Sequence, residues 1–130
     1  IVSIINKAIE LREGVSNSRH KGAVEEAIRY MEENFADPDL SLNSVAAYSN
    51  FSPNYMSMVF AQETGQTFVK YLTDFRMNKA KEMLRCTSKS GSDISYDVGY
   101  KDPHYFSYLF KRTQGVTPTQ YRNGHVQDNK

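Results

Sequence analysis

The sequence has few of the residues that build disulfides, metal sites or catalytic sites. Its 130 residues include one cysteine, Cys86, so no disulfide can form within the chain, and a lone thiol fits the cytoplasm. The three histidines, at positions 20, 104 and 125, show no metal-ligand spacing among themselves or with Cys86. No glycine-rich phosphate loop or nucleophile elbow occurs. We therefore expect no enzyme, no cofactor and no metal.

Charge and apolar runs are limited too. The net charge of +1 does not by itself indicate a nucleic-acid-binding protein. No apolar run approaches the roughly 20 residues of a membrane span, and no signal-peptide pattern occurs, so we expect no membrane association. The charge is uneven: residues 1–40 carry five Lys/Arg against eight Asp/Glu, whereas residues 41–130 carry eleven against seven. The basic later part gives modest support for an anionic partner.

What the sequence does contain is an internal repeat. Residues 52–71 and 102–121 are identical at seven of twenty positions when they are aligned with an offset of fifty. A repeat of this kind changes the interpretation of the whole fold. The identical pairs are Pro53/Pro103, Tyr55/Tyr105, Ser57/Ser107, Phe60/Phe110, Gly65/Gly115, Thr67/Thr117 and Tyr71/Tyr121.

Each copy predicts one helix with a marked start and end. Ser52 and Asp102 are N-cap residues, and each is followed by a proline, which is favoured at the first helical position. A glycine twelve residues after each proline suits the left-handed conformation that ends a helix. Helical spacing predicts that the inward-facing residues are Tyr55, Met56, Val59 and Phe60 in the first copy and Tyr105, Phe106, Leu109 and Phe110 in the second.

A short helix precedes each copy. The first follows Ser41, a candidate cap, and the second begins at about residue 92. Asn50 and Gly99 occupy equivalent places before the repeat, and both residue types tolerate a positive φ. A short helix, such a turn and a capped second helix are typical of a helix-turn-helix motif. The sequence therefore predicts two such motifs in tandem, at about residues 41–65 and 92–115.

The rest of the chain is predicted to be helical or polar. Residues 67–85 form a basic connecting helix about 28 Å long, and residues 23–35 form an amphipathic helix. Residues 1–22 are interpreted as a short apolar helix and a polar linker that follow a missing upstream domain, and residues 123–130 as a flexible tail. The predicted fold class is all-α: two helix-turn-helix lobes joined by a long central helix, about seven helices in all.

With these features in place, residues 23–122 resemble the DNA-binding domain of the AraC/XylS family of bacterial transcription regulators. The second motif carries the most specific string: Val98, Gly99, Tyr100, Tyr105, Phe106, Phe110, Lys111, Arg112, Gly115, Thr117, Pro118, Tyr121 and Arg122. The first adds Leu42, Ala46, Ser52, Pro53, Tyr55, Phe60, Glu63, Thr64 and Gly65, and the connecting helix adds Arg76, Ala80 and Lys81.

The resemblance implies that helices 53–64 and 103–114 enter successive major grooves of double-stranded DNA. A separation of about 34 Å would suit this geometry. Helical spacing then selects the residues that face outward to meet bases and phosphates. The predicted DNA-binding residues are Pro53, Asn54, Ser57, Met58, Gln62, Pro103, His104, Ser107, Tyr108, Lys111 and Arg112.

Some positions depart from the family pattern. Members often carry arginine where this chain has Met58 or Tyr108, and a lysine pair where it has Ala61 and Gln62. The missing arginines suggest modest affinity or recognition through DNA shape. Gly91 replaces a usual apolar residue and Ser95 a usual alanine, so the sequence predicts a weak helix at the start of the second lobe.

Two alternatives remain open. The upstream domain could be a receiver, as in response regulators, or a domain that binds a sugar or another small molecule; RNA polymerase is a further expected partner. The chain could instead be a helical protein-interaction module that has lost DNA binding and docks through Met58 and Tyr108. The sequence does not specify the operator, the regulated genes, the direction of regulation or the oligomeric state.

Overall fold

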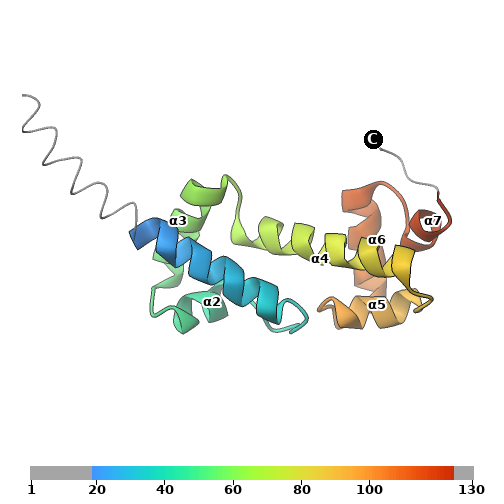
Figure 1. Ribbon diagram of the computed structural model, residues 1–130, viewed down its shortest axis with the longest axis horizontal. Helices are drawn as coiled ribbons and strands as arrows, with labels where there is room; N and C mark the ends of the chain where they lie inside the picture. The colour runs from blue at the N-terminus through green and yellow to red at the C-terminus, as the bar shows by residue number, and fades with distance from the viewer. Residues whose placement is uncertain (1–18, 125–130) are drawn as a thin grey trace, which may run out of the picture. The chain divides into compact units, whose positions relative to one another are not determined.

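The computed structural model describes residues 19–124, so the predicted helix within residues 1–13 and residues 125–130 of the tail lie outside the described residues. Within this range the chain forms seven helices and no strand (Figure 1), which confirms the all-α prediction of about seven helices. The helices are 19–34, α2 (Leu42–Tyr48), α3 (Pro53–Thr64), α4 (Phe68–Cys86), α5 (Gly91–Asp97), α6 (Pro103–Gln114) and α7 (Pro118–Arg122).

The chain divides into two compact units, and each holds one of the predicted motifs. Among the described residues, the first unit comprises 19–33 and Ser41–Val69, with α2 packed on α3. The second comprises Asn34–Leu40 and 70–124, with α5 packed on α6 and α6 on α7. Figure 1 shows α5, α6 and α7 gathered around the later turns of α4.

The predicted caps and turns are confirmed. Ser41 begins α2 in a capping box, in which its side chain accepts from the backbone of Ser44 and the Ser44 side chain accepts from the backbone of Ser41. The turns of the two motifs contain Asn50 at φ 62° and Gly99 at φ 103°. Both α3 and α6 end at a left-handed glycine, as the repeat predicts.

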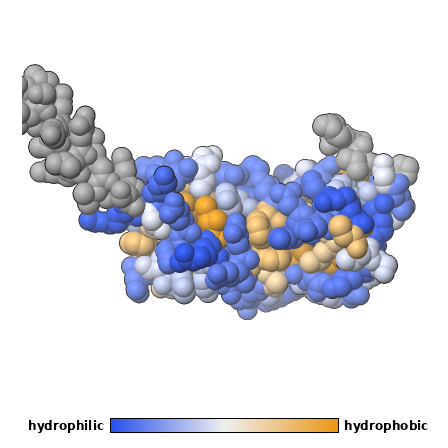
Figure 2. All heavy atoms as spheres, viewed as in Figure 1, coloured by the Kyte–Doolittle hydropathy of each residue, from blue (hydrophilic) through white to orange (hydrophobic). Residues whose placement is uncertain are grey.

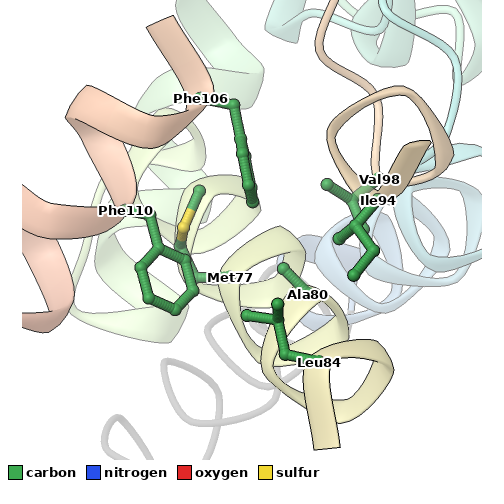
Figure 3. Packing of buried hydrophobic residues seen from close by; sticks show 7 residues of the cluster. All are labelled: Met77, Ala80, Leu84, Ile94, Val98, Phe106 and Phe110. Atoms are coloured by element: carbon green, nitrogen blue, oxygen red, sulfur yellow. The ribbon is translucent and has the colours of Figure 1, made fainter. Parts of the chain in front are cut away.

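Each unit has an apolar core of its own. In the first unit, Phe60 of α3 and Phe68 of α4 meet edge to face with ring centroids 5.4 Å apart. In the second, side chains of α4, α5 and α6 converge from three directions (Figure 3). This second cluster consists of Met77, Ala80, Leu84, Ile94, Val98, Phe106 and Phe110.

One of two predicted boundaries is wrong. The helix 19–34 includes residues 19–22, which the sequence assigned to a linker, because Gly22 weakens a helix without ending it. The second motif begins close to residue 92, as predicted: Ser90 caps α5 by accepting from the Asp93 amide at 3.1 Å, and Gly91 is the first helical residue. Glycine at the end of a helix destabilises it less than glycine inside it. Gly91 therefore weakens α5 less than the sequence suggested.

The buried Ser95 hydroxyl has a hydrogen-bond partner. Its hydroxyl donates to the carbonyl of Ser92 at 2.7 Å within α5. A buried hydroxyl that makes a hydrogen bond avoids most of the cost of burying a polar group. The replacement of a usual alanine by Ser95 is therefore accommodated inside the helix.

Two side chains lie elsewhere than predicted. Tyr105 was expected to face inward but is 51% exposed. Arg76 belongs to the connecting helix that was predicted to be basic, but its side chain is only 6% exposed. Its Nε donates to the carbonyl of Phe35 and its Nη2 to the carbonyl of Asp37, both at 2.9 Å. Arg76 thus holds the segment Asn34–Leu40 within the second unit.

Candidate nucleic-acid interface

The predicted DNA-binding residues lie on the outer faces of α3 and α6. Each side chain is exposed except Pro103, which is half-buried. The inner faces supply the large core residues, such as Phe60 in α3 and Phe110 in α6. Amphipathic helices of this kind leave one polar face free for a partner. The structure brings Pro53, Asn54, Ser57, Met58 and Gln62 together on α3, and Pro103, His104, Ser107, Tyr108, Lys111 and Arg112 on α6.

The starts of these helices are built by side-chain caps. The Ser52 hydroxyl accepts from the Tyr55 amide at 3.1 Å, and the Asp102 carboxylate accepts from the His104 amide at 2.9 Å. The proline at each first position has no N–H. The caps therefore occupy amides that could otherwise meet a phosphate, and the carboxylate adds negative charge at the start of α6. The starts of α3 and α6 therefore have fewer free amides for a phosphate than uncapped helices would.

The two outer faces differ in charge. Helix α3 contains no lysine or arginine, and its one charged residue is Glu63. Helix α6 contains Lys111 and Arg112 in its last turn and no acidic residue. Cations near a helix C-terminus are favoured by the helix dipole. Of the two candidate recognition helices, only α6 therefore offers a cationic contact to a DNA backbone.

Most of the basic residues on α4 have partners within the second unit. Lys81 donates to the side-chain oxygen of Gln114 at 2.9 Å, and Arg85 donates to the Tyr121 hydroxyl at 2.6 Å. With Arg76 buried, three of the five lysine and arginine side chains of α4 contribute to the fold of the unit. The basic character of α4 is thus weaker support for phosphate binding than the sequence indicated.

A hollow of about 500 Å³ lies beside the start of α6. It brings the predicted residues His104 and Ser107 together with the starts of α5 and α7. Hydroxyl groups dominate the polar lining, which includes Ser90, Ser92, His104, Ser107, Thr117 and Thr119. The predicted base contacts of the second unit thus stand at the edge of a concave, uncharged surface.

The described residues show no feature of a metal site or a membrane span. Among residues 19–124, no group of three histidine, cysteine, aspartate or glutamate side chains could hold a metal ion. None of the helices in this range is both long and apolar enough to cross a membrane. Hydrophilic residues cover most of the face visible in Figure 2, and hydrophobic residues form a few patches.

Comparison with known proteins identifies the family. The sequence model of a helix-turn-helix domain family matches residues 45–124, which cover most of the first motif and all of the second. The chain belongs to the AraC-type helix-turn-helix family. The resemblance expected from the repeat is therefore confirmed, and members of this family are transcription regulators.

Three known proteins show the range of similarity. The C-terminal domain of AraT, a response regulator from Geobacillus stearothermophilus, is 41% identical with a TM-score of 0.78 over 82% of this chain and 88% of that one. The arabinose operon regulatory protein of Escherichia coli K12 is 31% identical over 86% of this chain, which spans only 39% of that protein. The DNA-binding domain of AdpA, solved with a target DNA, shares the fold at 20% identity and TM-score 0.74, over 78% of this chain and 91% of that one.

Sequence reasoning missed a contact on the outer face of α6. Arg112 Nη1 donates to the Tyr108 hydroxyl at 2.9 Å. The Tyr108 ring lies beside Tyr105 with centroids 6.4 Å apart, and Tyr105 lies 6.1 Å from Tyr100. The spacing in the sequence could have indicated this contact, since residues four apart lie next to each other on a helix. Helical spacing was used only to select the residues that face outward, and not to pair them with one another.

Proposed function

We propose that this chain is the sequence-specific DNA-binding part of a transcription regulator, with α3 and α6 entering successive major grooves. The observation that carries the proposal is the repeated arrangement of a turn, a capped helix and an exposed polar face in both units. Family membership supports it, and so does the target DNA held by AdpA, a protein of the same fold. We expect no catalytic activity and a cytoplasmic location.

The outer-face residues suit different parts of the duplex. Asn54 and Gln62 present amides that match the edge of adenine, and Met58 can contact the methyl group of thymine. His104 and Ser107 stand at the start of α6, where a recognition helix meets base edges. Lys111 and Arg112 suit phosphates, because an arginine pairs well with two phosphate oxygens.

A regulatory domain upstream is part of the proposal. AraT is a response regulator, and its C-terminal domain is similar to this chain over most of the length of both. This similarity favours a receiver over a domain that binds a small molecule. A transcription regulator of this kind would also contact RNA polymerase, which would link DNA binding to transcription.

A salt titration tests DNA binding against the interaction module. Binding of a fluorescent duplex of random sequence is followed by anisotropy from about 50 to about 200 mM salt, a range in which phosphate contacts lose affinity steeply. We expect the logarithm of the affinity to fall linearly with the logarithm of the salt concentration. Weak binding that does not change with salt would contradict the proposal and favour a module that docks a protein through Met58 and Tyr108.

A further inference from the structure

The hydroxyl of Tyr108 and the guanidinium of Arg112 lie together on the outer face of α6. The hydroxyl accepts from Arg112 Nη1 at 2.9 Å, although the tyrosine is 56% exposed and the arginine is exposed too. An exposed arginine on a flexible stem samples many rotamers, and binding one anion requires it to give up most of them. A hydrogen bond that fixes the guanidinium in advance reduces that cost.

The tyrosine is itself held by neighbouring rings. Its ring lies 6.4 Å from that of Tyr105, and Tyr105 lies 6.1 Å from the half-buried Tyr100. The Arg76 guanidinium lies over the Tyr100 ring at 5.1 Å from its centroid. Aromatic neighbours at such spacing restrict one another. The Tyr108 hydroxyl therefore belongs to a row of side chains that starts at the buried Arg76.

The bond leaves the binding capacity of the arginine largely intact. A guanidinium has five N–H donors, and the bond to Tyr108 uses only one. The edge formed by Nε and Nη2 can still donate two parallel hydrogen bonds to two oxygens. Orientation by Tyr108 is thus compatible with a bidentate contact to a DNA phosphate.

The arrangement is confined to the second unit. At the equivalent positions of the repeat, α3 carries Met58 and Gln62, which provide neither the hydroxyl nor the cation. We propose that Tyr108 is a positioning residue, which orients the Arg112 guanidinium so that the two side chains act as one contact to the DNA backbone. This inference rests on the proposed DNA binding, and it gives the two residues a shared role.

The test is a double-mutant cycle in the 130-residue chain. Anisotropy titrations with a random-sequence duplex compare wild type, Tyr108→Phe, Arg112→Ala and the double variant. Tyr108→Phe removes one hydrogen bond and should weaken binding about 2- to 10-fold. In the Arg112→Ala background the same change should have an effect below about 2-fold, since the hydroxyl then has no guanidinium to orient.

Tyr105→Phe is the matched control. It removes the same atom from a tyrosine of similar exposure on the same helix, and its effect should stay below about 2-fold. Salt dependence adds a second readout: Arg112→Ala should lower the salt slope by about one, whereas Tyr108→Phe keeps the cation and should leave the slope unchanged.

The outcomes separate this inference from the proposed function. Equal effects of Tyr108→Phe and Tyr105→Phe in a chain that binds DNA would overturn the positioning role alone. A loss from Tyr108→Phe that persists in the Arg112→Ala background would also overturn it, since Tyr108 would then contact DNA by itself. A wild-type chain that does not bind DNA would overturn both.

Discussion

The guanidinium of Arg76 fills the space that a side chain at Gly99 would need. A Cβ atom added at Gly99 would lie 2.8 Å from Arg76 Cζ and would also collide with the carbonyl oxygen of Phe35. That carbonyl is the group to which Arg76 Nε donates. The turn of the second motif, the long helix α4 and the segment before α2 therefore meet at one point, and the point requires glycine.

Gly99→Ala should destabilise the second unit by more than about 2 kcal/mol. The substitution combines the cost of a positive φ for an L-residue with the displacement of Arg76. Gly65→Ala is the matched control, since Gly65 also has a positive φ of 78° but nothing within 4 Å of an added Cβ. It should cost only about 1–2 kcal/mol. Urea denaturation followed by circular dichroism measures both, and equal losses would contradict the contact at Gly99.

Arg76→Ala should destabilise the fold by about 2–4 kcal/mol. It leaves the carbonyls of Phe35 and Asp37 without the donors that now serve them. Arg76→Lys keeps the charge but loses the fork that reaches two carbonyls, so its loss should be smaller.

The control for Arg76 is Arg29→Ala, which removes an exposed ion pair with Glu26. Such pairs contribute about 0–1 kcal/mol. The free energies of unfolding from urea titrations compare the three variants. A loss for Arg76→Ala no larger than that for Arg29→Ala would rule out the anchoring role of Arg76.

Tyr100 should make stability fall at alkaline pH. Burial raises the pKa of its hydroxyl above 10.0, and the nearby Arg76 opposes part of this shift. Because the pKa of Tyr100 is higher in the folded state than in the unfolded state, the neutral hydroxyl favours the folded state. This contribution to stability is fully present below the unfolded-state pKa of about 10 and is lost as the pH rises through the folded-state pKa.

The variant Tyr100→Phe isolates this effect from the other tyrosines. Urea denaturation at about pH 9 and about pH 11 brackets the titration. The wild type should lose more stability between the two pH values than Tyr100→Phe does. An equal loss in both proteins would show that the burial of Tyr100 does not affect its titration.

His104 and Arg112 should contribute to DNA binding in different ways. Arg112→Ala should weaken binding to all sequences and lower the salt slope by about one, because a phosphate contact carries no sequence information. His104→Ala should instead change the preference at one base pair, by about 1–3 kcal/mol. Affinities for a panel of single-base variants at two salt concentrations measure both effects. Equal losses that do not depend on salt would contradict the assignment.

Local features of the fold could be predicted from the sequence. The caps Ser52 and Asp102 and the glycines that end α3 and α6 depend on neighbours within a few residues, so one sequence contains the whole signal. The buried Arg76 could not be predicted in this way. Its acceptors lie about forty residues away, in a turn that shows no pattern pointing to α4.

The repeat also led to a wrong prediction of burial at one position. Tyr55 and Tyr105 are equivalent in sequence, and both were expected to face inward. Tyr55 is half-buried against Phe51 and His20, whose rings lie 4.9 and 5.6 Å away, and His20 comes from the distant helix 19–34. Tyr105 lies instead beside the half-buried Tyr100 and the exposed Tyr108 of its own unit. Equivalent residues thus differ in burial because the elements packed against them come from outside the repeat.

The exposure of the outer-face residues was predictable from helical spacing, whereas their contacts with DNA stay a prediction. Spacing fixes which side of a helix a residue lies on. The pairing of Tyr108 with Arg112 needed the geometry of both side chains. The central claim, that two units read two sites on DNA, depends on contacts that the chain makes only with its partner.

Selection of binding sites from random duplex DNA at two salt concentrations tests that claim most directly. We expect enrichment of a motif with two blocks about one helical turn apart, because each recognition helix reads one major groove. Enrichment should be sharper at the higher salt concentration, where non-specific phosphate binding is weaker. Enrichment of a single block, or no enrichment at either salt concentration, would contradict the account.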